Sequence, residues 1–218
     1  MKKLALLFLT LLMACGSPDK PPSAAKNTNT GVVITGKRPA SGFTGIKVGN
    51  NIAIEIAVGP DFDVSVEGDE GLVKTLTATV EEGTLTIALS EKHSRGTRVG
   101  VRVSMPELRE LEVSGGSTAL ITGVKGEKVR LRANGSANIR IGGEVKMLEV
   151  RAEGASAIDA EALKTADADV EALRAARVSV SPSVSLKAHT TGIAAVVYTG
   201  GPKVEKTTED TSSVKKKE

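Results

Sequence analysis

From residue 43 onward, apolar and polar residues alternate in short runs that are separated by glycine, proline and small polar residues. Alternation with a period of two is typical of β-strands that have one buried face. The clearest runs are Ile52–Val58, Asp63–Glu67, Leu85–Leu89 and Val99–Val103. Gly83 separates the third run from a less regular segment before it, which predicts a β-hairpin at this glycine. The pattern therefore predicts an all-β fold.

A four-residue phrase recurs beyond residue 108, at a spacing near twenty residues. Its copies read Ser-Gly-Gly-Ser, Asn-Gly-Ser-Ala, Glu-Gly-Ala-Ser and Thr-Gly-Ile-Ala, and they contain Gly115, Gly135, Gly154 and Gly192. A repeat this short cannot bury its apolar face alone, so the series predicts a solenoid of stacked units with glycine at each corner. We place a degenerate copy at Glu171–Arg174, with Ala172 in the glycine position, and a partial copy at Glu209–Val214.

The stretch Ile158–Val178 has two interpretations. It is rich in alanine, glutamate and leucine, and its apolar spacing also fits a helix. The repeats on both sides favour strands, and we expect strands here.

The N-terminus has the pattern of a bacterial lipoprotein signal. Lys2 and Lys3 precede an apolar stretch, Leu4–Met13, which is too short to span a bilayer as a helix, since that requires about 20 residues. Leu12-Met13-Ala14-Cys15 then matches the lipobox. We therefore predict a signal peptide over residues 1–14 and acyl chains on Cys15, which anchor the mature protein to a membrane.

Four further boundaries follow from composition. Residues 15–41 form a polar tether, residues 42–214 the folded domain, and residues 215–218 a basic tail. Within the domain, irregular strands over 42–104 precede the small-residue repeats over 105–214. Gly16 and Ser17 follow the cysteine without an aspartate, which by resemblance to enterobacterial sorting favours the outer membrane.

Composition excludes several classes of protein. The formal net charge is +3, or +1 without Lys2 and Lys3, and no basic patch alternates with aromatic residues, so we expect no nucleic-acid partner. The chain has no Trp, one Tyr and three Phe, which argues against lectins and against platforms that stack on sugars or bases. Cys15 is the only cysteine, so no disulfide or thiol nucleophile is expected.

Few residues carry recognisable chemistry. His93 lies in a polar loop and His189 at the outward position of a strand, and neither has a second ligand at zinc spacing. A calcium site is one interpretation of five acidic residues, of which the last two are expected in a turn: Asp61, Asp63, Glu67, Asp69 and Glu70. A solvated edge with protective charges explains them better, so we expect no metal and no cofactor.

A second acidic group gives the enzymatic alternative. The group consists of Asp159, Glu161, Asp167, Asp169 and Glu171, and alternation places the last three on one face, as in a β-helical polysaccharide lyase or hydrolase. Arg151, Arg174 and Arg177 are close in the predicted stack, so a mixed-charge ladder on a soluble surface is the competing explanation.

Several segments together resemble the bacterial GIN-domain family, also called the putative auto-transporter adhesin head domain or DUF2807. They are Phe43–Val48, Gly83–Ile87, Met105–Leu111, the Ser-Gly-Ala-Ser-like repeats and Tyr198–Pro202. The resemblance implies a right-handed parallel β-helix in an exported protein or lipoprotein of a Gram-negative bacterium, without catalytic residues.

We therefore expect a non-catalytic, lipid-anchored envelope protein that acts in structure, adhesion or protein interaction, with an unidentified protein or surface glycan as its partner. The alternatives are the lyase or hydrolase and a periplasmic scaffold or sensor accessory. A groove containing Asp167 and Asp169 would favour the enzyme, and a flat, mixed-charge surface without a pocket would favour the binding module.

Overall fold

The computed structural model describes residues 33–89 and 99–218. The predicted signal peptide, Cys15, most of the predicted tether and His93 therefore lie outside the described residues. Strands are the predominant secondary structure of the described chain, which confirms the all-β prediction. The one helix in these two ranges is the short α1 (Glu70–Thr75). None of the described segments forms an apolar helix long enough to cross a membrane.

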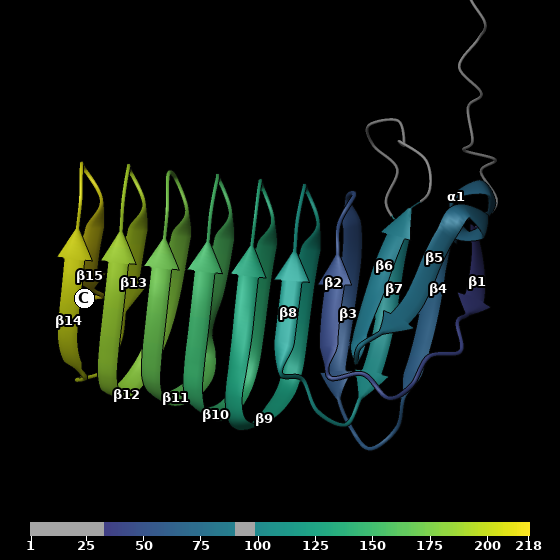
Figure 1. Ribbon diagram of the computed structural model, residues 1–218, viewed down its shortest axis with the longest axis horizontal. Coiled ribbons are helices and arrows are strands. Elements are labelled where there is room, and N and C mark those ends of the chain that lie inside the picture. Colours follow the sequence, from purple (N-terminus) through teal and green to yellow (C-terminus); the bar gives the residue numbers. More distant parts are fainter. Residues whose placement is uncertain (1–32, 90–98) are drawn as a thin grey trace, which may run out of the picture.

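Four long strands form the centre of a parallel solenoid (Figure 1). They are β9 (Thr118–Ala133), β10 (Asn138–Ala152), β11 (Ala157–Ala172) and β12 (Arg177–Thr190). Each strand bends near its middle, where the pairing register shifts, as between Ile141 and Gly143 of β10. The halves before the bends pair with one another to form a first sheet, and the halves after them form a second sheet. The two sheets enclose the core.

Shorter strands extend both sheets in each direction. The first sheet continues through β3 (Ile52–Val58) and β7 (Val99–Met105), and at the other end through β13 (Ala195–Tyr198) and β15 (Ser213–Lys216). The second sheet continues through β8 (Glu110–Val113), β2 (Gly45–Val48) and β6 (Thr84–Leu89), and at the other end through β14 (Lys203–Thr208). The partial copy beyond residue 208 thus forms a real final coil.

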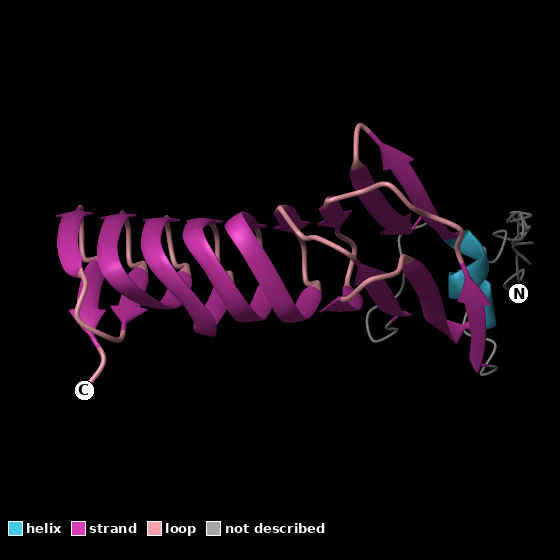
Figure 2. Cartoon of the chain, turned by 90° about the horizontal axis from the view of Figure 1, so that it is seen from below, coloured by secondary structure: helices cyan, strands magenta, loops and turns pink. Residues whose placement is uncertain are grey.

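Antiparallel strands close the N-terminal end. Strand β4 (Asp63–Asp69) pairs with β7, and β1 (Val33–Lys37) pairs with β4. Strand β5 (Leu76–Glu81) pairs with β6 across Gly83, which confirms the predicted hairpin. The ambiguous segment before this hairpin divides into α1 and β5. In Figure 2, α1 lies at the opposite end of the molecule from the C-terminus.

The core consists of side chains at alternate strand positions, stacked in columns from coil to coil. Val129, Leu148, Ala168 and Leu186 form one such column in register, and each is at most 2% exposed. Ala168 belongs to the stretch with two interpretations. Because β11 pairs with both β10 and β12, its backbone hydrogen bonds are satisfied between strands, and the helical interpretation is wrong.

The repeat glycines form a column at the tight corners between coils. Their φ angles are positive, at 69°, 76°, 82° and 74° for Gly115, Gly135, Gly154 and Gly192. The N–H after each corner donates to the corner carbonyl of the coil before it, as from Ala155 to Gly135 at 2.7 Å. A side chain at Gly154 would place its Cβ 2.7 Å from that same oxygen.

The corner of the degenerate copy lies two residues later than predicted. Ala172 lies within β11, in register with Ala152 and Thr190, and Arg174 occupies the corner with a φ of 65°. The N–H of Ala175 donates to the Gly154 carbonyl, as the stacking requires. An arginine in the left-handed region is strained, and an ion pair of 3.1 Å between Arg174 and Glu153 offsets part of that cost.

A buried serine next to this column gives a first prediction. The Oγ of Ser156 is buried without a hydrogen-bond partner, whereas Ala137 and Ala176 fill the same place in the adjacent coils. Since an unsatisfied buried hydroxyl costs about 1–3 kcal/mol, we expect Ser156→Ala to raise the free energy of unfolding by about 1 kcal/mol. Urea denaturation measures this change.

Ser117 provides the matched control. It holds the same place in an earlier coil, but its Oγ accepts a hydrogen bond of 3.2 Å from the Ile52 N–H. Ser117→Ala should therefore destabilise the fold by about 1 kcal/mol or more. Equal losses in the two variants would contradict the prediction for Ser156.

Candidate functional site

The candidate catalytic carboxylates lie on the outer face of the second sheet. Asp167, Asp169 and Glu171 alternate with core residues along β11, as the sequence predicted. Each faces a polar or basic neighbour: the Ser185 hydroxyl donates to Asp167 at 2.5 Å, Glu171 pairs with Arg151, and Asp169 is in register with Lys187. None of these three lines the groove of about 1000 Å³ on the first sheet, which the enzymatic alternative required of Asp167 and Asp169, whereas Asp159 and Glu161 of the same acidic group do line it.

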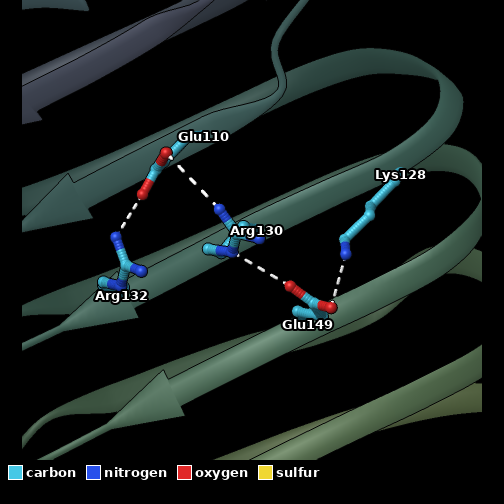
Figure 3. A network of polar contacts seen from close by, with 5 residues as sticks. All are labelled: Glu110, Lys128, Arg130, Arg132 and Glu149. Carbon is cyan, nitrogen blue, oxygen red and sulfur yellow. Dashed lines mark hydrogen bonds and ion pairs between the residues drawn. The ribbon is translucent and has the colours of Figure 1, made fainter.

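The predicted mixed-charge ladder covers this face (Figure 3). Glu110 of β8 pairs with Arg132 and, at 3.7 Å, with Arg130 of β9. Arg130 also donates to Glu149 of β10 at 2.9 Å, and Lys128 donates to the other Glu149 oxygen at 2.5 Å. These ion pairs join successive coils, so they support the stacking of the solenoid.

The ladder makes stability depend on pH through Glu149. The hydrogen bond from Lys128 holds the pKa of this carboxyl below its ordinary value of 4.5, and Arg130 adds to the effect against the opposing influence of burial. A carboxyl whose folded-state pKa is lowered contributes stability above its unfolded pKa and loses it as the pH falls through the folded value. The contribution is therefore complete at pH 7 and declines below about pH 4.5.

We expect Glu149→Gln to be less stable than the wild type at pH 7, and we expect this difference in the free energy of unfolding to shrink as the pH falls from 4.5 toward 3. Urea midpoints of both proteins at the two pH values measure the difference. A difference that stays constant between pH 7 and pH 3 would contradict the assignment to Glu149.

Three of the acidic residues near the N-terminal end form ion pairs with basic residues. Asp63 pairs with Lys37 at 2.7 Å, Glu67 with Arg102 at 2.9 Å, and Glu70 with Lys74 at 2.6 Å. The prediction that Asp69 and Glu70 lie in a turn is wrong. Asp69 ends β4 and caps α1, accepting from the Gly71 N–H at 2.9 Å, and Glu70 begins the helix.

These acidic residues do not form a calcium site. Across residues 33–89 and 99–218, no three His, Cys, Asp or Glu side chains are grouped so that they could hold a metal ion. His189 lies half-buried on the outer face of β12, in register with Glu171 and Thr207.

A groove of about 1000 Å³ crosses the outer face of the first sheet. Side chains of β4, β7, β3 and the first halves of β9 to β12 line it, and Lys217 from the C-terminal segment borders it. The expectation of a flat binding surface without a pocket is therefore wrong for this face. The sheet continues through β7 and β4 at one end, and Lys217 covers the other, so the face is concave between them.

Ion pairs hold most of the charged side chains of the groove. Arg102 contacts Glu55 at 3.3 Å as well as Glu67, Arg140 contacts Asp159 at 3.1 Å, and Lys217 contacts Glu161 at 2.6 Å. These ion pairs fix the positions of these charged side chains, which line the groove. Leu120 also lines the groove, and its side chain is 44% exposed.

Leu120 is the residue whose place in the sequence could have indicated this groove. It lies between the inward residues Ala119 and Ile121, at a position where alternation requires a polar side chain. A large apolar residue at an outward position indicates a contact surface.

Solved structures share this architecture. A putative adhesin from Bacteroides fragilis NCTC 9343 matches 86% of this chain and 97% of its own, with a TM-score of 0.70 and 15% identity. A putative adhesin from Parabacteroides merdae ATCC 43184 matches 87% and 98%, with a TM-score of 0.57 and 16% identity. A putative lipid binding protein from Parabacteroides distasonis ATCC 8503 matches 87% and 98%, with a TM-score of 0.50 and 20% identity. At these identities the likeness concerns the fold.

Among curated proteins, no relative matches this chain. The family model described as putative auto-transporter adhesin, head GIN domain, matches residues 42–202. These residues include strands β2 to β13, the groove-lining parts of every long strand and all four repeat glycines. The chain therefore belongs to the GIN-domain family of putative auto-transporter adhesins.

Proposed function

We propose that this protein is a non-catalytic adhesion or protein-interaction module, anchored by lipid on Cys15 to the outer membrane of a Gram-negative bacterium. The observation that carries the proposal is the groove on the first sheet, about 1000 Å³ in volume and bordered by side chains that ion pairs already hold in place. Side chains that are fixed before binding lose little conformational entropy when a partner docks. Membership in a family of adhesin-like proteins agrees with a binding role at the cell envelope.

The position of the chain ends supports this arrangement. Part of the predicted tether belongs to the fold, because Val33–Lys37 forms β1 and pairs with β4 at the end of the molecule that carries α1 (Figure 1). From Cys15 to Val33 the chain reaches at most about 60 Å. A lipid on Cys15 would thus hold the N-terminal end nearest to the membrane, and the stacked coils would extend away from it.

Protease shaving of intact cells tests the surface location. Lys26 lies in the tether and is followed by Asn27, so trypsin should cleave there and release the folded domain into the supernatant, where an antibody against the domain detects it. Permeabilised cells serve as the control for cleavage. Release from intact cells is the expected result.

The opposite result would favour the alternative. If the domain is released only after permeabilisation, it faces the periplasm, and adhesion to other cells or surfaces is excluded. A periplasmic scaffold or sensor accessory would then replace the adhesin as the working function.

A further inference from the structure

We infer that the groove binds an extended segment of a partner protein, with one carboxylate of the segment on Arg177 and an apolar side chain on Leu120. The inference rests on the proposed function, because it names the kind of partner that such a binding module would hold.

Arg177 is the basis for the carboxylate contact. Of the arginines within residues 33–89 and 99–218, it is the one whose guanidinium forms neither a hydrogen bond nor an ion pair, and it lines the groove. The other groove cations, Arg102, Arg140 and Lys217, each have a carboxylate partner. A planar guanidinium binds a carboxylate with two parallel hydrogen bonds, so an acidic side chain complements the one unpaired charge.

Leu120 is the basis for the apolar contact. Its register neighbours are Glu55 on β3 and Arg140 on β10. Glu55 pairs with Arg102 on the far side of β3, and Arg140 pairs with Asp159 on the far side of β10. Both charged side chains are therefore drawn away from Leu120, which leaves its surface open for an apolar group.

The spacing of the two contacts fits a short extended peptide. Leu120 is on β9 and Arg177 on β12, three strand spacings away, and neighbouring strands are about 4.8 Å apart. The separation across the strands is about 14 Å, and Arg177 lies two residues before Ser179, which shares the register row of Leu120, so the offset along the strands adds about 7 Å. The two backbone positions are therefore about 16 Å apart, which an extended chain covers in about five residues at about 3.3 Å each.

The floor between these contacts suits a peptide backbone. Asn138 and Ala157 lie in the same register row as Arg177, and both are small enough to leave the path open. Asn138 donates to the Ser136 carbonyl at 3.2 Å, which leaves its side-chain oxygen free to accept from a ligand N–H. No aromatic side chain in the described chain lines the groove, so it lacks the stacking surface that favours sugars.

Fluorescence polarisation with synthetic nonapeptides tests the inference. The peptides carry one leucine and one aspartate, one to seven residues apart, in a host of glycine, serine and threonine. The protein is the full mature chain with Cys15→Ala, so that no lipid is attached. We expect micromolar binding that is strongest when four or five residues separate the leucine from the aspartate.

Matched variants separate the groove from general charge effects. Arg177→Gln should weaken binding at least tenfold, whereas Lys187→Gln, which removes an exposed cation from the other face of β12, should leave it unchanged. Leu120→Ser should weaken binding severalfold, and Val184→Ser, at a side chain that is 61% exposed, should not. Replacing the peptide aspartate by asparagine should weaken binding by the same factor as Arg177→Gln does. Combining the two changes should weaken binding no further.

Two results would overturn the inference. One is the absence of binding by every peptide, and the other is binding that Arg177→Gln does not weaken. Polygalacturonate fragments provide the second probe: if they bind through Arg177 while the peptides do not, the groove holds an acidic glycan. That outcome leaves the proposed adhesion role intact, whereas protection from trypsin on intact cells would remove that role without affecting peptide binding.

Discussion

Gly143→Ala is expected to lower the free energy of unfolding by about 4 kcal/mol, at the upper end of single-substitution effects. Gly143 lies at the bend of β10 with a φ of 143°, and an added Cβ would overlap the Val124 oxygen and lie 2.6 Å from the Val124 nitrogen. Both atoms belong to the backbone of β9, so relief requires the two coils to separate. For a domain of this size, the melting temperature should fall by roughly 8–16 °C.

Substitutions at two further glycines serve as controls for the effect of Gly143→Ala. Gly201→Ala should change stability by less than about 1 kcal/mol, because a Cβ there would meet nothing within 4 Å and its φ is not in the left-handed region. Gly154→Ala should lie between the two, since its Cβ would contact a backbone oxygen at 2.7 Å. If the Gly143→Ala and Gly201→Ala variants have the same melting temperature, the close contact between β9 and β10 does not limit stability.

The solenoid could be predicted because its signal is periodic. Alternation marks the strands, and the small-residue phrase marks the corners, so β9, β10 and β12 follow from local sequence. The corner at Arg174 was placed two residues too early, at Ala172, because a small residue was taken as the marker of a left-handed corner. Its distance of twenty residues from Gly154 would have identified it, since the stacking fixes the spacing even where the residue type varies.

The groove could not be predicted from the sequence in the same way. Its residues come from seven strands and from the C-terminal segment, and the ion pairs that shape it join residues far apart in sequence, such as Glu161 and Lys217. Single-sequence patterns report which face of a strand points outward but not whether the assembled face is concave. The carboxylates of β11 illustrate the converse. Alternation placed them correctly on the outer face, and the predicted stack placed Arg151 near them. The pairing of β11 with β10 and β12 added Ser185 and Lys187 as neighbours, whereas Arg174 pairs with Glu153 and Arg177 lines the groove on the first sheet.

Cys15→Ala is expected to abolish attachment of the protein to the outer membrane. The lipobox Leu12-Met13-Ala14-Cys15 provides the thiol that accepts the lipid, and no other cysteine in the chain can replace it. Each buried methylene of an acyl chain contributes about 0.8 kcal/mol, so two or more chains give stable anchoring. Incorporation of labelled palmitate should be lost, and the domain should disappear from the outer-membrane fraction.

Ser17→Ala is the matched control, because it alters the same segment without removing the thiol, and it should keep both the label and the membrane fraction. Persistent label in Cys15→Ala would refute acylation at this residue. Loss of label with retention in the outer membrane would instead attribute the attachment to the folded domain. Since Ser17–Thr30 contains almost no apolar residues, only the acyl chains on Cys15 supply the hydrophobic surface that the proposed orientation of the solenoid requires.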